Sequence, residues 1–593
     1  MRVRATARAI PTLRTSSRLA AVVAAILLGG SPAGVAERAT CPGPAPAAAP
    51  VVRANDTVAK GRHGCVVAAE PEAARIGLEV MQKGGNAVDA AIAVFLALAV
   101  THPQAGNLGG GGFLLVRMAD GRTTAFDFRE RAPAAAHREL FVKADGSVDH
   151  DAAEHGIRAG AVPGSPAGMV AAQARFGTRP LAELAAPAIA LAREGFVVSP
   201  FLADDLAAAR RGFERFESSQ AVFWREGRPL QAGERLVQKD LADTLTRFAE
   251  GGFDGFYRGP TAARFSAYAA ELGGLITADD LAAYRVVERE PLRGSYRGHE
   301  FLVMPPPSSG GIALLQMLNL LEPFELAGFG HGSARSIHLL TEVMRRAYAD
   351  RARWLGDPDH YPVPATGLIS KEYADALRAG LRTDRVSEVA AGRPPGAKES
   401  DDTTHFSIVD AAGNAVACTT TINSTFGAQL VIDGLGFLLN NEMDDFSAKP
   451  GVPNQFGLVG GEANAIAPGK RPLSSMTPTI VLRDGQLRFV LGSPGGGRII
   501  NTVLQVALNR IDFDLPLREA VAAPRIHHQF LPARLSFERG AINPDTREIL
   551  TRMGHRFDSG PSGVGRCQAI EVTADGVRLG VADPRSGGAA RAY

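Results

Sequence analysis

The sequence predicts a layered α+β fold, in which strands pack face to face and helices cover them. Helical patterns dominate from about residue 180 to residue 382, broken by "MPPPSSGG" at residues 304–311. Strand patterns dominate from residue 405 to the end of the chain. Runs of helices and runs of strands that are separated along the chain are typical of α+β proteins, because each kind of element must bury its apolar face against another layer.

Two helices are expected near the start of the folded part. "EPEAARIGLEVMQKGG" has apolar residues at helical spacing and ends at Gly84 and Gly85. The next run, residues 86–100, begins with Asn86 as a cap and is apolar nearly all round. A helix of this kind is buried between layers.

The strands are expected in two groups, one before and one after the helical region. The early runs are "GGFLLVRM" and "TTAFDFRE". The later runs are "HFSIV", "AVACTTTI", "TIVLR", "LRFVLGS", "RLSFE" and "CQAIEV". Their β-branched and aromatic residues favour strands.

The composition is that of a globular protein. The 593 residues include 45% hydrophobic and 21% charged residues, with a net charge of +2. No basic cluster follows the N-terminus, so no nucleic-acid partner is expected.

The N-terminal residues are typical of a secretory signal. Residues 1–18 contain five arginines and no acid, and an apolar run of ten residues follows at 19–28. This run is too short to span a bilayer, so stable membrane insertion is not expected, although an uncleaved anchor is an alternative. Cleavage after Ala36 would leave a Pro/Ala-rich linker at 37–57. We expect an exported protein, periplasmic or secreted.

Four cysteines are too few for a disulfide scaffold in a chain of this length. Cys418 and Cys567 lie in apolar runs and are expected to be buried thiols. Whether Cys41 and Cys65 pair is left open. No Cys/His spacing typical of zinc and no HExxH occurs, so neither a metal nor a cofactor is expected.

The segment before Thr403 is the most unusual part of the sequence. Residues 383–402 are polar, contain two adjacent prolines and predict an exposed loop that tolerates cleavage. A cut between Asp402 and Thr403 would give Thr403 an α-amine of pKa about 7.7–8.0, which could serve as the base for its own hydroxyl. Two threonines at the start of a strand are more often structural, so the hypothesis needs further site residues.

Other runs supply the remaining parts of an acyl-transfer site. The turn "GSPGGGR", residues 492–498, can present backbone N–H groups to an oxyanion. An amino-acid carboxylate could be held by Arg129, Ser474 and Ser475, and its ammonium by Glu442 and Asp445. Each of these groups has an ordinary structural interpretation, such as a surface ion pair, a turn or a solvated loop. Together they describe a pocket for an amino-acid zwitterion beside a threonine.

From about residue 58 onward, the chain resembles the γ-glutamyltransferase (glutathione hydrolase) family of the N-terminal-nucleophile hydrolase superfamily. The runs that carry the resemblance are "GGNAVDAA", "THPQAGNLGGGGF", "DFRE", "YRG", "MPPPSSGG", "YADR", "LGDPD", "TTHFSIVD", "NNEMDDFSAKPGVPN", "RPLSSMTPTI", "GSPGGGR" and "DPRSGG". The combination of "TTH", "PLSSM" and "GSPGG" in this order is highly specific.

The resemblance implies a four-layer αββα sandwich and autocleavage into a large subunit, 58–402, and a small subunit, 403–593. The two subunits would form a heterodimer and one folded unit. The implied reaction moves the γ-glutamyl group of glutathione or a related compound onto Thr403, and then to water or to an amino-acid or peptide acceptor. The implied roles are nucleophile for Thr403, its support for Thr421, oxyanion donors for Gly495 and Gly496, carboxylate binding for Arg129, Ser474 and Ser475, and ammonium binding for Asn423, Glu442 and Asp445.

Two positions depart from many bacterial relatives. Glu442 stands where they often have Gln, which adds a carboxylate near the ammonium. Phe456 stands where many have Tyr, in a lid-like run at residues 450–461, so the lid is expected to lack one hydrogen bond.

Three other functions are compatible with parts of the sequence. A cephalosporin acylase of the same superfamily would act on a glutaryl amide, which has no ammonium for Glu442 and Asp445 to bind. An exported binding protein for γ-glutamyl peptides would need no cleavage at Thr403. A serine hydrolase is disfavoured because "GPSGV", at Gly560, does not match the GxSxG elbow.

Overall fold

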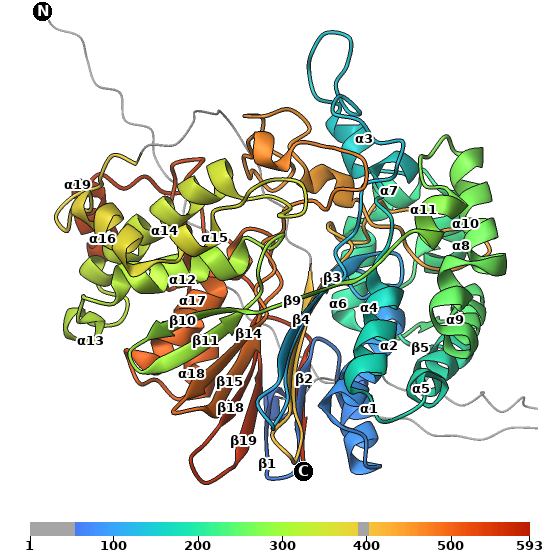
Figure 1. Cartoon of the computed structure of the whole chain (residues 1–593), viewed down its shortest axis with the longest axis horizontal. Helices are drawn as coiled ribbons and strands as arrows, with labels where there is room; N and C mark the ends of the chain where they lie inside the picture. The colour runs from blue at the N-terminus through green and yellow to red at the C-terminus, as the bar shows by residue number, and fades with distance from the viewer. Residues whose placement is uncertain (1–53, 390–402) are drawn as a thin grey trace, which may run out of the picture. The chain divides into compact units, whose positions relative to one another are not determined.

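The computed structural model describes residues 54–389 and 403–593 (Figure 1). The expected signal peptide, Cys41 and Asp402 therefore lie outside the described residues. The first described element, η1 (Ala54–Thr57), falls within the last residues of the expected linker.

Two seven-stranded antiparallel sheets form the centre of the fold. The first sheet has, in spatial order, β1 (Val58–Gly61), β19 (Arg578–Ala582), β18 (Gln568–Val572), β15 (Gln486–Gly492), β14 (Thr479–Arg483), β11 (His299–Val303) and β10 (Leu292–Tyr296). The second has β20 (Ala589–Ala592), β2 (Cys65–Ala68), β12 (Thr404–Val409), β13 (Ala415–Thr421), β3 (Gly111–Arg117), β4 (Thr123–Asp127) and β9 (Val287–Arg289).

The two sheets can pack face to face because their central strands have apolar side chains on both faces, one toward the other sheet and one toward the helices. On β3, Phe113 and Leu115 lie in the core between the sheets, and Leu114 and Val116 lie in the core under the helices. Successive side chains of a strand point to opposite faces of the sheet, and both faces of β3 are buried. The opposite sheet contributes residues such as Val490 to the core between the sheets.

Helices cover the outer face of each sheet (Figure 1). The second sheet is covered by α1 (Pro71–Gln82), α2 (Ala87–Thr101), α4 (Ser165–Phe176), α5 (Leu181–Glu194), α9 (Lys239–Tyr257) and α10 (Gly259–Glu271). The first is covered by α12 (Gly310–Leu321), α14 (Ala334–Trp354), α17 (Arg498–Ile511) and α18 (Leu517–Ala522). The predicted α+β, four-layer αββα sandwich is confirmed.

The predicted helix after Asn86 is confirmed in detail. The Asn86 side chain accepts hydrogen bonds from the N–H groups of Val88 and Asp89, and the Asp89 carboxylate accepts one from the Asn86 N–H. This reciprocal capping box fixes the first turn. Every residue of α2 is buried, as its apolar surface requires.

Three predictions of local structure were wrong or incomplete. β9, β10 and β11 lie in the stretch expected to be mainly helical; β10 alternates between half-buried and exposed residues at a sheet edge, so its apolar pattern is weak. The run "RLSFE" forms only β17 (Ser536–Phe537), paired with β16 (Ile526–His527). The described part of the expected exposed loop, residues 383–389, is mostly exposed as predicted, but Ser387 is buried and its backbone N–H donates to Glu342 on α14.

The remaining short elements connect these layers. They are α3 (His150–Glu154), η2 (Ile157–Ala159), β5 (Phe196–Val197), α6 (Pro200–Ala208), α7 (Arg210–Phe213), α8 (Glu217–Phe223), β6 (Trp224–Arg225), β7 (Arg228–Pro229), β8 (Arg235–Leu236), α11 (Ala278–Ala282), α13 (Leu326–Phe329), α15 (Ala365–Leu368), α16 (Lys371–Ala379), η3 (Glu442–Asp445), η4 (Glu462–Asn464) and α19 (Pro544–Arg552).

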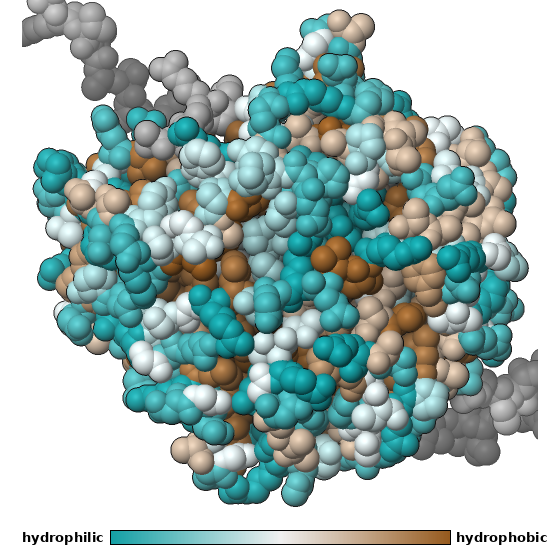
Figure 2. All heavy atoms as spheres, viewed as in Figure 1, coloured by the Kyte–Doolittle hydropathy of each residue, from teal (hydrophilic) through white to brown (hydrophobic). Residues whose placement is uncertain are grey.

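Cys418 and Cys567 are buried free thiols, as predicted, and Cys65 is a third. Within the described residues, no helix combines the length and the apolar character needed to cross a bilayer. On the face shown in Figure 2, hydrophilic residues predominate and apolar residues form small, separate patches.

Candidate active site

Thr403 lies immediately before β12, one of the central strands of the second sheet. The register pairs Thr404 with Thr420 on β13, which brings Thr403 next to Thr421. Their Oγ1 atoms are 3.5 Å apart, longer than a typical O–H···O bond. Thr421 Oγ1 also accepts a hydrogen bond of 2.8 Å from the Asn423 N–H. Thr421 is thus well fixed, and the hydroxyl of Thr403 can approach it by a small movement.

The structure brings nearly all of the predicted site residues into one pocket. Gly495 lies beside it, and Asp402 is outside the described residues. The pocket is lined by Arg129, Thr403, Thr421, Asn423, Glu442, Asp445, Phe456, Leu458, Ser474, Ser475, Met476, Gly496 and Ile499.

Arg129 is fully buried and lies at the centre of the charged side of the pocket. Its Nη1 donates to Glu442, and its Nη2 donates to Asp445 Oδ2 at 2.5 Å. Nε and Nη2 also donate to the carbonyls of Pro472 and Leu473. Burial opposes the charge, but the neighbouring carboxylates outweigh it and raise the pKa of Arg129, so the guanidinium stays charged. The expected carboxylate-binding and ammonium-binding groups are therefore in direct contact.

Glu130 is a buried carboxylate that the sequence analysis did not single out. It lies 3.4 Å from Arg129 Nη1, and its carboxyl group interacts electrostatically with that of Glu442. Burial raises the pKa of both carboxyl groups, and although Arg129 opposes the shift, the two groups also compete for ionisation. We infer that the pair holds one proton near neutral pH. Glu442 Oε2 has no partner within the described chain and borders the pocket.

Arg351, on α14, is a second buried arginine that sequence reasoning missed. Its Nη2 donates to Ser475 Oγ at 3.1 Å, and its Nε donates to Ser309 Oγ at 3.0 Å. Ser309 in turn donates to the carbonyl of Ser474 from both its N–H and its hydroxyl. Arg351 thus fixes the "PLSS" segment from behind. Only the "YADR" run, which ends at this residue, pointed to it.

The glycine turn predicted between a strand and a helix joins β15 to α17. Gly495 has a φ of +130° and Gly496 of +48°, conformations that favour glycine. Neither N–H donates to another group of the described chain, so both are available to an oxyanion. The ring of Phe456 packs against this turn, since a Cβ on Gly496 would lie 3.1 Å from its Cδ1.

His405, in the "TTH" motif, does not act as a base in this pocket. Burial lowers its pKa to about 3, so the imidazole is neutral. Its nitrogens lie 2.8 Å from Thr419 Oγ1 and 3.1 Å from Ser407 Oγ, on the side of β12 that faces the first sheet at Gly492. Histidine is absent from the residues that line the pocket.

The lid-like run is held by its own backbone and by hydrogen bonds to residues in and around the pocket, among them a bond of 3.1 Å from the Asn454 side chain to Asp445 Oδ1. Gly451 N–H donates to the Gly460 carbonyl at 3.0 Å, and Asn454 Oδ1 accepts from the N–H groups of Phe456 and Leu458. The Ser424 hydroxyl donates to Gln455 Oε1 at 2.5 Å. A hydrogen bond between the lid and the segment after Asn423 is therefore present, although Phe456 has no hydroxyl.

A wider, open cleft adjoins Gly495 on the other side of the glycine turn. Three arginines, Arg539, Arg566 and Arg585, line it together with Pro494 and Gly495. Arg585 is paired with Glu538 and Asp583. Arg539 and Arg566 make no ion pair with a described residue. This cleft can accept an anionic group close to the oxyanion donors.

The two packed sheets, their helical layers and a pocket at the start of a central strand define an N-terminal-nucleophile hydrolase fold. A family model described as Gamma-glutamyltranspeptidase matches residues 73–593. The chain belongs to the γ-glutamyltranspeptidase family.

Three known proteins show the extent of the similarity. The glutathione hydrolase proenzyme of Escherichia coli (strain K12) is 48% identical over 530 residues, covering 89% of this chain and 91% of that protein. The crystal structure of cephalosporin acylase from Bacillus halodurans is 30% identical with a TM-score of 0.81, covering 93% of this chain and 99% of that chain. The structure of Helicobacter pylori gamma-glutamyltranspeptidase is 43% identical with a TM-score of 0.53, covering 54% and 91%.

Proposed function

We propose that this protein is an exported, autoprocessed enzyme that transfers γ-glutamyl groups from glutathione or related compounds to water or to an amino-acid or peptide acceptor. The observation that carries the proposal is the pocket in which Thr403 lies beside Arg129, Glu442 and Asp445. A hydroxyl and buried charges of both signs match a γ-glutamyl group, whose reactive carbonyl is separated from a zwitterionic head. The family and the Escherichia coli relative support it.

Maturation would begin when the Thr403 hydroxyl attacks the carbonyl of Asp402. The peptide becomes an ester, and water resolves it to leave Thr403 with a free α-amine. The large subunit, 58–402, and the small subunit, 403–593, would remain together, because each of the two sheets contains hydrogen-bonded strands from both parts.

In the proposed reaction, the α-amine of Thr403 removes the proton from its own Oγ1, which attacks the γ-carbonyl carbon. The oxyanion accepts hydrogen bonds from the N–H groups of Gly495 and Gly496. The amide C–N bond then breaks, and the leaving amine takes the proton from the Thr403 amine. Water or an acceptor amine attacks the resulting ester and regenerates the hydroxyl.

The head of the substrate would be fixed at both charges, so that only the γ-carbonyl reaches Thr403. Glu442, Asp445 and Asn423 would bind the ammonium, and Ser474, Ser475 and Arg129 the carboxylate. All five N–H groups of Arg129 face acceptors in the structure, so its contact with a carboxylate requires it to give up one of them, such as the 3.3 Å bond to Leu473. We propose that the open cleft beside Gly495 receives the leaving peptide and the acceptor.

The test combines N-terminal sequencing of the purified protein with assays on a γ-glutamyl anilide and a glutaryl anilide. A new N-terminus at Thr403 and turnover of the γ-glutamyl compound support the proposal. The similarity to a cephalosporin acylase makes glutaryl acylase activity the second candidate, and preference for the glutaryl anilide would favour it. A single full-length chain without either activity would favour a binding protein.

A further inference from the structure

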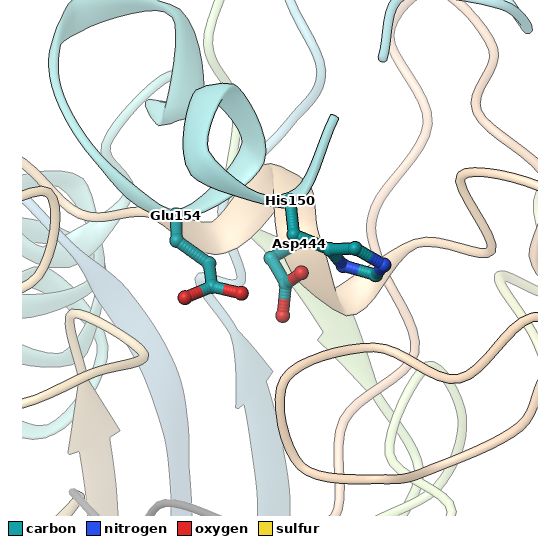
Figure 3. Close-up of side chains that lie close together, drawn as sticks. All are labelled: His150, Glu154 and Asp444. Carbon is teal, nitrogen blue, oxygen red and sulfur yellow. The ribbon is translucent and has the colours of Figure 1, made fainter. Parts of the chain in front are cut away.

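A cluster of three potential metal ligands lies outside the catalytic pocket. His150 and Glu154 are the first and last residues of α3, and Asp444 belongs to η3. The spacing of four residues places His150 and Glu154 on the same face of one helical turn. One ligand atom from each of the three residues lies within 4.8 Å of the others. Figure 3 shows the three side chains side by side, from two segments far apart in the sequence.

Asp444 is the unusual member of the cluster, because it is a carboxylate with only 3% of its surface exposed and no cationic partner among the described residues. One of its oxygens accepts a hydrogen bond of 3.2 Å from the Gln455 N–H. Burial raises the pKa of Asp444, and its acidic neighbours Asp445 and Glu154 raise it further. A buried carboxylate in a negative environment requires a proton or a cation.

The neighbouring charged residues of α3 already have partners. Asp151 is paired with Arg215 at 2.8 Å and with His155 at 3.2 Å. In contrast, the His150 and Glu154 side chains make no hydrogen bond or ion pair with any described residue. The His150 and Glu154 side chains are thus available to bind an ion, whereas the Asp151 carboxylate already has partners.

We propose that His150, Glu154 and Asp444 bind a divalent transition-metal ion of the zinc type, which ties α3 to η3. One imidazole and two carboxylates form a ligand set that suits zinc, and water would complete the coordination. Ligand atoms around a tetrahedral zinc ion lie about 3.4 Å apart, whereas those of the cluster lie within 4.8 Å of one another, so the cluster must close by up to about 1.4 Å. His150 is exposed and Glu154 is half-buried, so both side chains have room to move.

The ion would join segments on the two sides of the proposed cleavage at Thr403, since α3 precedes it and η3 follows it. It would also fix the Asp444 carboxylate, which accepts a hydrogen bond from the N–H of Gln455, the lid residue next to Phe456. The site is distinct from the catalytic pocket, which contains Asp445 but none of the three ligands.

The experiment uses the purified full-length protein, whether processed or not, after treatment with a chelator. Zinc chloride is titrated by calorimetry, and cobalt chloride is followed by visible absorption, because Co²⁺ reports the ligand geometry without any activity assay. The proposal expects one zinc ion per chain and a rise in Tm on binding. His150→Ala and Glu154→Gln should each weaken zinc binding at least tenfold and reduce the cobalt absorption, with unchanged basal activity.

His137→Ala is the matched control, because His137 is also exposed, lies in the same part of the chain and is outside the cluster. It should bind zinc as the unmodified protein does. Asp444→Asn tests the buried ligand by affinity alone, because it also alters the lid contact. Equal zinc affinity in the unmodified protein, His150→Ala and Glu154→Gln would overturn the proposal, as would no binding at all. These readouts do not depend on catalysis, so a failure of the metal-site proposal can be distinguished from a failure of the proposed function.

Discussion

Replacing Arg129 by Lys tests the centre of the proposed substrate site. The guanidinium donates to Glu442, to Asp445 and to two backbone carbonyls, and it has five N–H groups for these contacts. Lysine keeps the charge but has three N–H groups on one atom, so it cannot bridge both carboxylates in the same geometry. Loss of one charge-assisted contact costs about 1.5–3 kcal/mol. If this cost falls on the transition state, kcat/KM for γ-glutamyl substrates should drop roughly 10- to 100-fold.

The assay is initial-rate hydrolysis of a γ-glutamyl anilide, with a denaturing gel to show that processing is intact. Arg346→Lys is the matched control, because Arg346 is also buried and is paired with Glu342 at 2.9 Å, but lies outside the pocket. It should lower Tm with little effect on kcat/KM. If the processed Arg129→Lys enzyme keeps its kcat/KM, or loses no more than the control, the role of Arg129 in binding the substrate head is refuted.

Four further predictions follow from the same pocket. Thr403→Ala should remain a single inactive chain on a denaturing gel; cleavage of the same bond without added protease would contradict self-processing. Glu130→Gln should flatten the pH dependence of Tm. Burial, opposed by Arg129, raises the pKa of Glu130 in the folded protein to about 7, so the native state binds more protons than the unfolded state above about pH 4.3. The stability of the unmodified protein should therefore fall as pH rises toward 7. An equally steep decline in the variant would argue against the shared proton. Arg351→Met should weaken substrate binding by releasing Ser475, seen as a raised KM at nearly unchanged kcat, and an unchanged KM would exclude this positioning role. Phe456→Tyr should raise the ratio of transfer to hydrolysis about 2- to 10-fold, the equivalent of one hydrogen bond, measured as product partition with glycylglycine as acceptor; an equal ratio would mean that the Gln455–Ser424 contact already holds the lid.

Several polar residues that line the pocket could be predicted because they lie in short runs whose chemistry is visible locally, whereas Thr421, Asn423 and Phe456 were expected only from the family resemblance. The glycines of the turn, the two serines and the acidic pair near residue 442 each suggest a binding function before any contact is known. Arg351 was indicated only by the "YADR" run of the family resemblance, and its local sequence does not suggest a binding function. Its contact with Ser475 joins residues 124 positions apart, and its own surroundings are those of an ordinary amphipathic helix.

The missed elements have a similar physical explanation. β10 is an edge strand with one exposed face, so packing against β11 determines its structure more than its own pattern does. The cluster around His150 could not be predicted either, since "HDAAE" does not match the HExxH motif and the third ligand, Asp444, lies on a different segment. Local patterns therefore predicted the layers and the chemistry, and long-range contacts determined how the charges are paired.

The balance of charges in the pocket bears directly on which acyl group it accepts. Near neutral pH, the two buried guanidinium groups of Arg129 and Arg351 are balanced by Asp445 and by the Glu130–Glu442 pair, in which burial raises both pKa values and which we infer to hold one proton. The zwitterionic head of a γ-glutamyl group adds no net charge to this arrangement. A glutaryl group adds one negative charge and brings no ammonium to Glu442 Oε2, which has no other partner. An unbalanced buried charge costs several kcal/mol, and this cost is sufficient to favour γ-glutamyl over glutaryl substrates by several orders of magnitude. The opposite preference would mean that the carboxylates are protonated in the complex, and that the pocket does not select for an ammonium group.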